Sequence, residues 1–268
     1  MARLFDLYMD SAQFQKLRPS SQRQYQMYLG QFADNLGPAP ASQLERKDVL
    51  LLLDKRARTA GAANMLLAIG RAVWSWGRKR GHVSNNPFDG IDAMDMGEHQ
   101  PWPDALVKQA LESDDGRIRL VVHLLYYTAQ RIGDVAALAW RDIDGDKIVM
   151  TQQKTGKTLV IPMHADLAAE LARHPRSLAT ILNVPLTKSG LHTIRKPLQD
   201  YAAARGHKVV PHGLRKNAVN ALLEAGCSAA ETAAISGQSL QMVEHYSKGR
   251  SQAKLGRSAI LKWQRNKA

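Results

Sequence analysis

Apolar positions recur every three or four residues along much of the chain, which is the spacing of a single buried helix face. The first helix predicted in this way starts at Ser20 or Ser21, where a hydroxyl can cap it, and stops at Gly37-Pro38. Its apolar side consists of Tyr25, Tyr28, Leu29, Phe32 and Leu36. Ser42 and Glu45 form a capping-box pattern at the start of a second helix.

A third helix is predicted from about Ala62 to Arg80. Its core-facing positions are Met65, Leu66, Ile69, Val73 and Trp76. The helical pattern stops after Pro87, and glycines and prolines punctuate the connection that follows. We therefore expect a helical domain over residues 1–96, a linker over 97–102 and a second domain over 103–268.

The second part of the chain also has mainly helical patterns. Helices are predicted from about Pro103 to Glu112, Ile118 to Thr128, Ala165 to Arg173 and Leu191 to Tyr201. A break at Arg131 precedes another helix, which is expected to hold Val135, Leu138 and Trp140. Residues 174–190 have no decisive pattern.

An alternating pattern interrupts these helices and predicts a β-hairpin. Ile148 and Met150 on one strand are expected to face Leu159 and Ile161 on the other, with the segment Lys154-Thr-Gly-Lys157 at the turn. The fold class predicted from the whole pattern is mainly α with a small β-sheet, an α+β arrangement.

The segment from Pro211 to Tyr246 combines two short helical patterns with polar residues of several chemical types. Proline suits the first turn of a helix, because the N–H that it lacks would have no partner there. The buried side of the first helix is expected to hold Leu214, Ala218 and Leu222. His212 and Arg215 are three residues apart, so both side chains lie on one face of this helix.

Gly226 predicts the end of that helix, and Ser228 with Glu231 forms a capping-box pattern at the start of the next one. A loop at Ser236-Gly237-Gln238 then leads to Tyr246. Taken alone, these residues favour an ordinary structural helix pair, so any functional role depends on the rest of the chain.

The charge of the chain narrows the choice of partner. The sequence has 37 lysines and arginines against 24 aspartates and glutamates, a formal net charge of +13 and a pI near 10.0. This surplus favours a polyanionic partner, and we expect nucleic acid. The sequence has neither an apolar run of about eighteen residues nor the layout of a signal peptide, so we expect a cytoplasmic protein with no membrane partner.

The residue types that bind metals are not arranged as a metal site. The nine histidines are scattered without paired spacing, and neither CxxC nor HExxH is present. The single cysteine, Cys227, cannot form an internal disulfide, and its apolar neighbours favour a packing role. We therefore expect no metal and no other cofactor.

Several basic residues allow two interpretations each. One basic cluster at the end of the third helix consists of Arg71, Arg78, Lys79 and Arg80. These cations either are solvent-exposed at a helix C-terminus, where the helix dipole favours positive charge, or contact phosphates. Arg131 lies at a helix break, where it either extends into solvent or meets an anion, and the nearby Gly133 favours the anion. Lys154 at a hairpin tip is, by itself, typical of an exposed lysine.

In chain order the sequence presents Arg131, Lys154, the pair His212 and Arg215, and Tyr246. This order resembles the tyrosine recombinases, particularly the phage-type integrases. The strings that carry the resemblance are Thr128-Ala-Gln-Arg-Ile-Gly-Asp, Gln153-Lys-Thr-Gly-Lys, His212-Gly-Leu-Arg and Gly237 to Tyr246. The end of the family's core-binding domain is also matched, by Trp76, Gly81-His82 and Asn86-Pro87.

The resemblance implies a helical DNA-binding core-binding domain followed by a catalytic domain. It implies a site-specific recombinase that cuts and rejoins double-stranded DNA without a metal, through a 3′-phosphotyrosyl intermediate. Tyr246 would attack the scissile phosphate. Arg131 and Arg215 would neutralise the charge that grows on its non-bridging oxygens.

The remaining site residues also take their roles from the resemblance. Lys154 would protonate the leaving 5′-oxygen, and His212 would handle the tyrosine proton as general acid or base. Asp134 would brace the site. The DNA backbone would be contacted by Arg71, Arg78, Lys79, Arg80 and Lys157.

One position departs from the family pattern. The family usually has histidine or tryptophan where this chain has Gln238, eight residues before Tyr246 instead of about nine. Gln238 keeps an N–H donor for a phosphate oxygen but cannot carry a proton or charge there. Two alternatives therefore stay open: a DNA-binding relative with weak or no cleavage, and a strand transferase like a type IB topoisomerase. His245 is interpreted as structural, because adjacent residues do not face one another.

The tail from Ser251 to Ala268 has apolar residues at helical spacing, namely Leu255, Ala259, Ile260 and Trp263. One interpretation is a helix packed on its own domain. The resemblance favours a C-terminal helix that docks on a neighbouring protomer and links a homotetramer on paired DNA. It also allows for accessory DNA-bending proteins, and it places the protein at a bacterial nucleoid, encoded by a phage or another mobile element.

Overall fold

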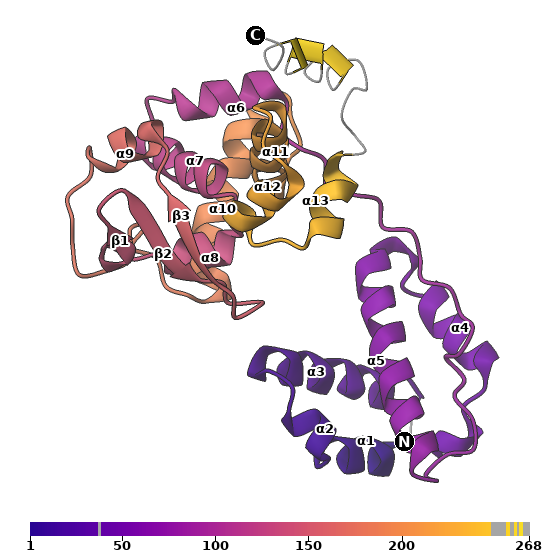
Figure 1. The fold of residues 1–268 in the computed structure, drawn as a ribbon. Helices are drawn as coiled ribbons and strands as arrows, with labels where there is room; N and C mark the ends of the chain where they lie inside the picture. Colours follow the sequence, from indigo (N-terminus) through magenta and orange to yellow (C-terminus); the bar gives the residue numbers. More distant parts are fainter. Residues whose placement is uncertain (37–38, 248–255, 258–259, 262, 265–268) are drawn as a thin grey trace. The chain divides into compact units, whose positions relative to one another are not determined.

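The chain forms two compact units, residues 1–98 and residues 99–268. A computed structural model describes residues 1–36, 39–247, 256–257, 260–261 and 263–264 (Figure 1). Within these residues, the helices are all too short or too polar to cross a membrane.

The first unit is built around its longest helix, α5. Its elements are α1 (Ala2–Met9), α2 (Ala12–Gln15), α3 (Pro19–Leu36), the 3-10 turn η1 (Ala41–Gln43), α4 (Arg46–Asp54), the 3-10 turn η2 (Ala57–Thr59) and α5 (Ala60–Lys79). Helices α1, α3 and α4 all contact α5. The fully buried Trp74 of α5 has its ring 5.0 Å from Phe88, 5.7 Å from Phe5 and 6.0 Å from Phe32. These aromatic contacts form the centre of the core.

Two predicted helix starts in this unit are wrong. Helix α3 begins at Pro19, so Ser20 and Ser21 lie inside its first turn, because proline is favoured at the first helical position. Ser42 lies in η1 and does not cap α4. Asp48 caps it instead, by accepting a hydrogen bond from the Glu45 N–H at 3.0 Å. The predicted stop at Gly37-Pro38 falls outside the described residues.

The second unit is organised around α7 (Gly116–Thr128), a helix that is apolar on most sides and therefore buried. The other helices are α6 (Asp104–Leu111), α8 (Ile132–Ala137), α9 (Ala165–Leu171), α10 (Lys188–Ala203), α11 (Pro211–Glu224), α12 (Ala229–Ser236) and α13 (Leu240–Ser247), with the 3-10 turn η3 (Trp140–Asp142). Helices α6, α9 and α11 pack against α7. This packing places α11, with His212 and Arg215, against the core of the unit.

A small antiparallel sheet lies beside these helices, with the strand order β1-β2-β3 (Figure 1). Its strands are β1 (Ile143–Asp144), β2 (Lys147–Thr151) and β3 (Thr158–Pro162). Ile148 pairs with Ile161, and Met150 with Leu159, and all four are buried, so the predicted hairpin is confirmed. The short strand β1 was not predicted. The predicted fold class, mainly helical with a small sheet, is confirmed.

The helix expected to hold Val135, Leu138 and Trp140 is shorter than predicted. Helix α8 ends at Ala137, because Leu138 adopts an extended conformation with φ −63° and ψ 123°. Trp140 lies in η3, where the Asp142 carboxylate accepts a hydrogen bond from the Ala139 N–H at 2.8 Å. Apolar spacing alone did not distinguish this turn from a continuing helix.

The other helix ends around the site agree with the prediction. Pro211 is the first residue of α11, and Ser228 with Glu231 forms the capping box of α12. On α11, Leu214 and Ala218 are buried as expected, whereas Leu223 is more buried than the predicted Leu222.

Candidate active site

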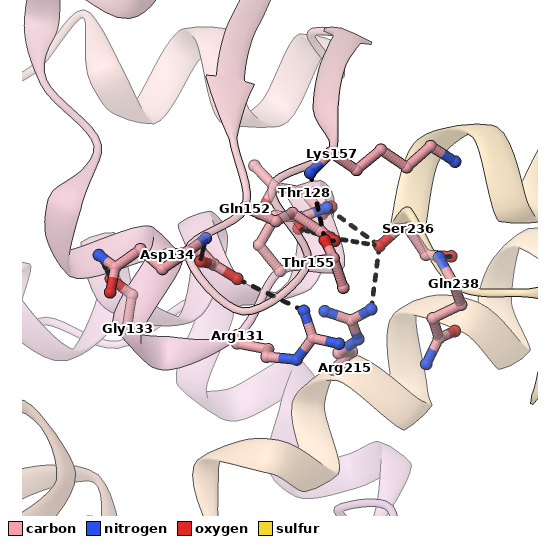
Figure 2. Close-up of polar contacts among 12 residues, drawn as sticks. Thr128, Arg131, Gly133, Asp134, Gln152, Thr155, Lys157, Arg215, Ser236 and Gln238 are labelled. Carbon is pink, nitrogen blue, oxygen red and sulfur yellow. Dashed lines mark hydrogen bonds and ion pairs between the residues drawn. The ribbon is translucent and has the colours of Figure 1, made fainter. Parts of the chain in front are cut away.

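The candidate site lies in the second unit, where the junction of α7 and α8, the hairpin turn and the loop after α12 meet (Figure 2). At the junction, Ala129 takes the left-handed conformation with φ 53° and ψ 30°, which ends α7. The chain then turns so that Arg131 becomes the residue preceding α8. Ala129 is 1% exposed, so this turn is part of the core.

Asp134 connects Arg131 to the hairpin. Its buried carboxylate lies 3.7 Å from Nη1 of Arg131, measured from Oδ2. The other oxygen, Oδ1, accepts a hydrogen bond from the backbone N–H of Gln153 at 2.8 Å. Asp134 therefore holds the arginine and the start of the turn together (Figure 2).

Helix α11 supplies two polar side chains near its start, His212 and Arg215. The Arg215 guanidinium is 1% exposed, and its Nη2 donates to the Ser236 carbonyl at 2.9 Å. Burial lowers the pKa of Arg215 to about 10, and Arg131 adds to the effect, while Tyr246 and Asp134 act in the opposite direction. Arg131, Tyr246 and Asp134 therefore all lie close enough to Arg215 to shift the pKa of its guanidinium.

His212 lies in the same cationic surroundings. Burial lowers its pKa to about 4, and the positive charge of Arg215 contributes next. His99, whose ring lies 5.7 Å from the His212 ring, lowers it further, as do Lys216 and Arg131. The imidazole is consequently neutral near pH 7 and free to accept a proton.

Tyr246 lies on α13, which packs against α11 and α12. Its ring is partly buried against the small apolar cluster of Val219, Leu223, Ala233 and Val243. Nζ of Lys216 is 5.1 Å from the ring centre. The neighbouring His245 is exposed.

Gln238 follows the left-handed Gly237 that ends α12. Its backbone N–H donates to Oγ of Ser236 at 3.4 Å, and Figure 2 shows Gln238 on the loop beside Ser236. Its side-chain Oε1 is buried and makes no hydrogen bond within the described residues. The predicted departure from the family pattern is thus located at the edge of the site.

Lys154 and Lys157 are exposed on the hairpin turn. Neither ammonium group takes part in an ion pair or hydrogen bond with the part of the chain that the structure describes. The structure therefore brings Arg131, Asp134, His212 and Arg215 together, with Tyr246 and Gln238 close by, and leaves both lysines at the rim.

The basic cluster predicted to contact DNA belongs to the first unit, and its members have different surroundings. Arg71 is partly buried and donates to the carbonyls of Phe88, at 3.2 Å, and of Ile91, so it holds the segment after α5 in place. Arg78 forms an ion pair with Asp89 at 3.0 Å. Arg80 lies 4.7 Å above the Trp76 ring, and Lys79 is exposed. Only the last three present cationic groups to solvent.

Three buried polar residues of the site were not predicted from the sequence: Gln130, Gln152 and Ser236. The side-chain amides of the two glutamines hydrogen-bond to one another at 2.7 Å, and both reach the Ser236 carbonyl. A usable signal existed, since Gln152 occupies the buried side of a strand pattern that otherwise places apolar residues there. In the described part of the chain, no group of three or more His, Cys, Asp or Glu residues is arranged to hold a metal ion.

Known proteins are similar in sequence to about half of this chain. The integrase of Escherichia phage lambda is 37% identical over 139 residues, which cover 49% of this chain and 39% of that protein. The prophage integrase IntR of Escherichia coli K12 is 22% identical over 145 residues, or 53% of this chain and 33% of that protein. The chain thus matches less than half the length of these relatives.

Solved structures extend the similarity to nearly the whole fold. A crystal structure of a lambda integrase dimer bound to a COC′ core site has a TM-score of 0.78 at 20% identity, covering 94% of this chain and 97% of that chain. A structure of the Tn1549 transposon integrase with a circular intermediate DNA has a TM-score of 0.77 at 14% identity, covering 97% and 98%. At these identities the likeness establishes a shared fold.

The family comparison covers the residues of the candidate site. A sequence model of the phage integrase family matches residues 104–252, which is more than half of the chain. This range begins at α6 and includes Arg131, Lys154, His212, Arg215 and Tyr246. The chain belongs to the phage integrase family.

Proposed function

We propose that this chain is a site-specific recombinase that cuts and rejoins double-stranded DNA through a covalent bond between Tyr246 and a 3′-phosphate. Membership of the phage integrase family supports the reaction class. The similar lambda integrase structures contain a core site in one case and a Holliday junction in another, which supports DNA as the substrate.

The observation that carries the proposal is the buried Arg215 guanidinium. Its Nε and Nη1 are buried and have no hydrogen-bond partner among the described residues. Buried donors are nearly always paired in folded proteins. The neighbouring Arg131 lowers the pKa of Arg215 by like charge, so it does not compensate the buried cation. A phosphodiester group supplies both the negative charge and paired acceptor oxygens.

The chemistry follows from these positions. The Tyr246 oxygen attacks the phosphorus, a P–O bond to tyrosine forms, and the bond between phosphorus and the 5′-oxygen breaks. Negative charge grows on the two non-bridging oxygens, and the guanidiniums of Arg131 and Arg215 stabilise it. The reverse reaction, with a 5′-hydroxyl as the attacking group, rejoins the strand and releases Tyr246.

His212 has the protonation state of a general base. Its lowered pKa, about 4, leaves the imidazole neutral, so it can take the phenolic proton as Tyr246 attacks. It returns that proton when the strand is rejoined. Arg215 then carries the permanent charge of the site, and His212 carries the mobile proton.

Lys154 is proposed as the acid that protonates the departing 5′-oxygen. It is exposed on the turn between β2 and β3, where its ammonium group is free to reach a DNA strand. Lys157 on the same turn is proposed to contact the DNA backbone. Asp134 is proposed to fix Arg131 relative to this turn.

The rest of the chain is proposed to hold the DNA. Residues 1–98 form a helical unit that we assign as a core-binding domain, and its exposed Arg78, Lys79 and Arg80 are candidates for phosphate contact. We assign no DNA contact to Arg71, because its donors hold the segment from Phe88 to Ile91. A homotetramer on paired sites, with accessory DNA-bending proteins, is proposed by analogy with the relatives. The C-terminal helix predicted to link its subunits lies mostly outside the described residues.

The second candidate is a relative that binds DNA but cleaves it poorly. It is favoured by Gln238, which stands where the family usually has histidine or tryptophan, and whose Oε1 is buried without a partner in the described structure. A topoisomerase-like strand transferase uses the same chemistry without a specific site. Relaxation of supercoiled plasmids of unrelated sequence would favour that assignment.

A trapping experiment tests the leading proposal. A library of nicked duplexes, in which the short strand beyond the cleavage point is lost after attack, is incubated with the protein, and adducts are isolated under denaturing conditions. The wild type is expected to form an adduct whose DNA, when sequenced, defines the site. Tyr246→Phe is expected to form none.

Tyr201→Phe is the matched control, because Tyr201 lies on α10 and its hydroxyl donates to the Gln109 carbonyl. This variant is expected to form the adduct at the wild-type rate. An adduct that persists in Tyr246→Phe would refute the proposed nucleophile. Sequence-specific DNA binding without any wild-type adduct would favour the second candidate.

A further inference from the structure

The carbonyl oxygen of Ser236 accepts hydrogen bonds from three buried side chains. Nη2 of Arg215 donates at 2.9 Å and Nε2 of Gln152 at 3.0 Å (Figure 2). Nε2 of Gln130 donates at 3.4 Å. Ser236 is the last residue of α12, so its carbonyl has no partner within the helix. The three donors come from three different segments and meet at this one atom.

The two glutamines are also joined to one another and to the surrounding backbone. Nε2 of Gln152 donates to Oε1 of Gln130 at 2.7 Å. The two N–H groups of Gln130 Nε2 have three carbonyl acceptors, those of Thr128 at 2.8 Å, Ile235 at 3.1 Å and Ser236 at 3.4 Å, so one N–H is shared between two of them. Oε1 of Gln152 accepts from the Thr155 hydroxyl at 2.7 Å. Gln130 is 1% and Gln152 0% exposed, so the pair is a fully hydrogen-bonded polar network in the core.

Each member of this network is close in sequence to a proposed site residue. Gln130 precedes Arg131, Gln152 lies two residues before Lys154, and Ser236 lies two residues before Gln238. The Arg215 guanidinium is held by the same carbonyl oxygen. The network therefore ties together the backbone on which the proposed site is built.

We propose that Gln130 and Gln152 are positioning residues that set the Arg215 guanidinium against Arg131 and fix the segments that carry Arg131, Lys154 and Gln238. The inference rests on the proposed function. An apolar pair would fill the same space, but it would leave the Ser236 carbonyl with Arg215 as its remaining side-chain donor. The segments would then be free to shift relative to one another while the core stayed packed.

The geometry of Gly237 supports a close fit between the loop and the Gln152 amide. A Cβ atom at Gly237 would lie 2.5 Å from Nε2 of Gln152 and 2.9 Å from its Cδ. The loop thus approaches the amide more closely than any residue with a side chain allows. The left-handed φ of Gly237, 68°, is a second reason for glycine at this position.

The test compares Gln152→Met, Gln130→Met and the double variant with the wild type. Methionine has nearly the length of glutamine and keeps the apolar packing, but it neither donates nor accepts these hydrogen bonds. Two quantities are measured: the rate constant of adduct formation at saturating nicked DNA, and the equilibrium affinity for the same DNA with Tyr246→Phe in the background. The sequence of this DNA is the one recovered by trapping.

Each single variant is expected to form the adduct at least about tenfold more slowly, because small misplacements of catalytic groups lower the chemical rate strongly. DNA affinity is expected to stay within about twofold, since the phosphate-contacting surface is unchanged. The double variant is expected to be no slower than the slower single variant, because the two amides hydrogen-bond to one another and either substitution breaks that pair.

Ile194→Val, a core substitution on α10 away from the network, controls for lost stability. It is expected to lower the unfolding temperature without slowing adduct formation by folded protein. Unchanged adduct rates in the glutamine variants would refute the positioning role but leave the proposed function standing. The same holds if the rate reductions of the two single variants multiply in the double variant. Absence of an adduct from the wild type on every duplex in the library would refute the proposed function and this inference with it.

Discussion

The side-chain amide of Asn217 makes two hydrogen bonds with the backbone of Trp102. Its Oδ1 accepts from the Trp102 N–H at 2.7 Å, and its Nδ2 donates to the Trp102 carbonyl at 2.8 Å. The Trp102 indole N–H also donates to the Val210 carbonyl at 2.8 Å. The segment from His99 to Trp102 is thereby anchored on α11, which explains how the His99 ring comes to lie beside His212.

Replacing Asn217 tests this anchor. Asn217→Leu has a similar volume but leaves the N–H and carbonyl of the buried Trp102 without these partners, so unfolding free energy is expected to fall by about 2–3 kcal/mol. The measurement is urea unfolding followed by tryptophan fluorescence. Asn220→Leu, one turn away on α11, changes a side chain whose buried Oδ1 has no hydrogen-bond partner among the described residues, so it is expected to change stability by less than about 1 kcal/mol. Equal effects of the two substitutions would contradict the assigned anchor.

Ala129→Gly is expected to stabilise the second unit. Ala129 has a positive φ of 53°, and an L-residue with a Cβ is about 1 kcal/mol less favourable than glycine in that conformation. Loss of one buried methyl group offsets part of the gain, so the net increase in unfolding free energy is about 0.5 kcal/mol. Ala136→Gly in α8 makes the same chemical change at ordinary helical geometry and also removes a buried methyl group, so it is expected to destabilise by about 2 kcal/mol. Equal losses in both variants would show that the Ala129 turn is unstrained.

The parts of this fold that follow from local pattern were predictable. The start of α11 at Pro211 and the pairing of β2 with β3 follow from residue spacing and helix-end chemistry. The early end of α8 was missed, because Leu138 continues the apolar spacing while its backbone is already extended. Local spacing could not reveal that the Arg71 donors are used by carbonyls seventeen and twenty residues away.

The site shows the same division. The order of the charged residues along the sequence matched that of a known family, and it predicted which segments form the site. The pairing of Gln130 with Gln152 was not visible, because the two amides are 22 residues apart and buried hydrogen bonds between amides have no periodic sequence signature. The strand pattern marks Gln152 as buried, but it does not identify Gln130 as the partner of its amide.

The pH dependence of stability should report the environment of His212. Its pKa is lowered from 6.5 to about 4, so the unfolded chain binds this proton more readily than the folded one. The contribution of neutral His212 to the free energy of unfolding is fully present above pH 6.5 and is lost as the pH falls from 6.5 toward 4. Since the side chain is only partly buried, we expect a loss of about 1–2 kcal/mol after allowance for solvent screening.

Unfolding free energies at pH 7.5 and pH 4.5, compared between wild type and His212→Gln, isolate this contribution. The variant is expected to lose less stability over this interval, because glutamine does not titrate. His207→Gln, on the connection before α11, is the control and is expected to keep the wild-type slope. Identical slopes for wild type and His212→Gln would contradict the lowered pKa.

Arg215→Lys should separate charge from geometry. Lysine is positively charged in water, but it cannot offer the paired donors of a guanidinium. Position 215 is only 1% exposed, and burial to that extent favours the neutral form of a lysine. Adduct formation is expected to slow by about a hundredfold or more. Addition of magnesium or EDTA is expected to leave both the wild-type and variant rates unchanged. A lysine variant with the wild-type rate would show that point charge is sufficient at this position.

Gln238→His tests whether the residue that departs from the family pattern limits the reaction. An imidazole at this position can carry a proton and positive charge toward a phosphate oxygen, whereas the amide offers only a neutral N–H. The buried Oε1 of Gln238, which lacks a partner in the described structure, is also removed. We expect adduct formation to accelerate by about tenfold, because a hydrogen bond to a charged group contributes about 1–2 kcal/mol more than a neutral one. Gln241→His, at an exposed position of α13, is the control and should leave the rate unchanged. A rate in Gln238→His equal to or below that of the wild type would mean that glutamine is not what limits this site.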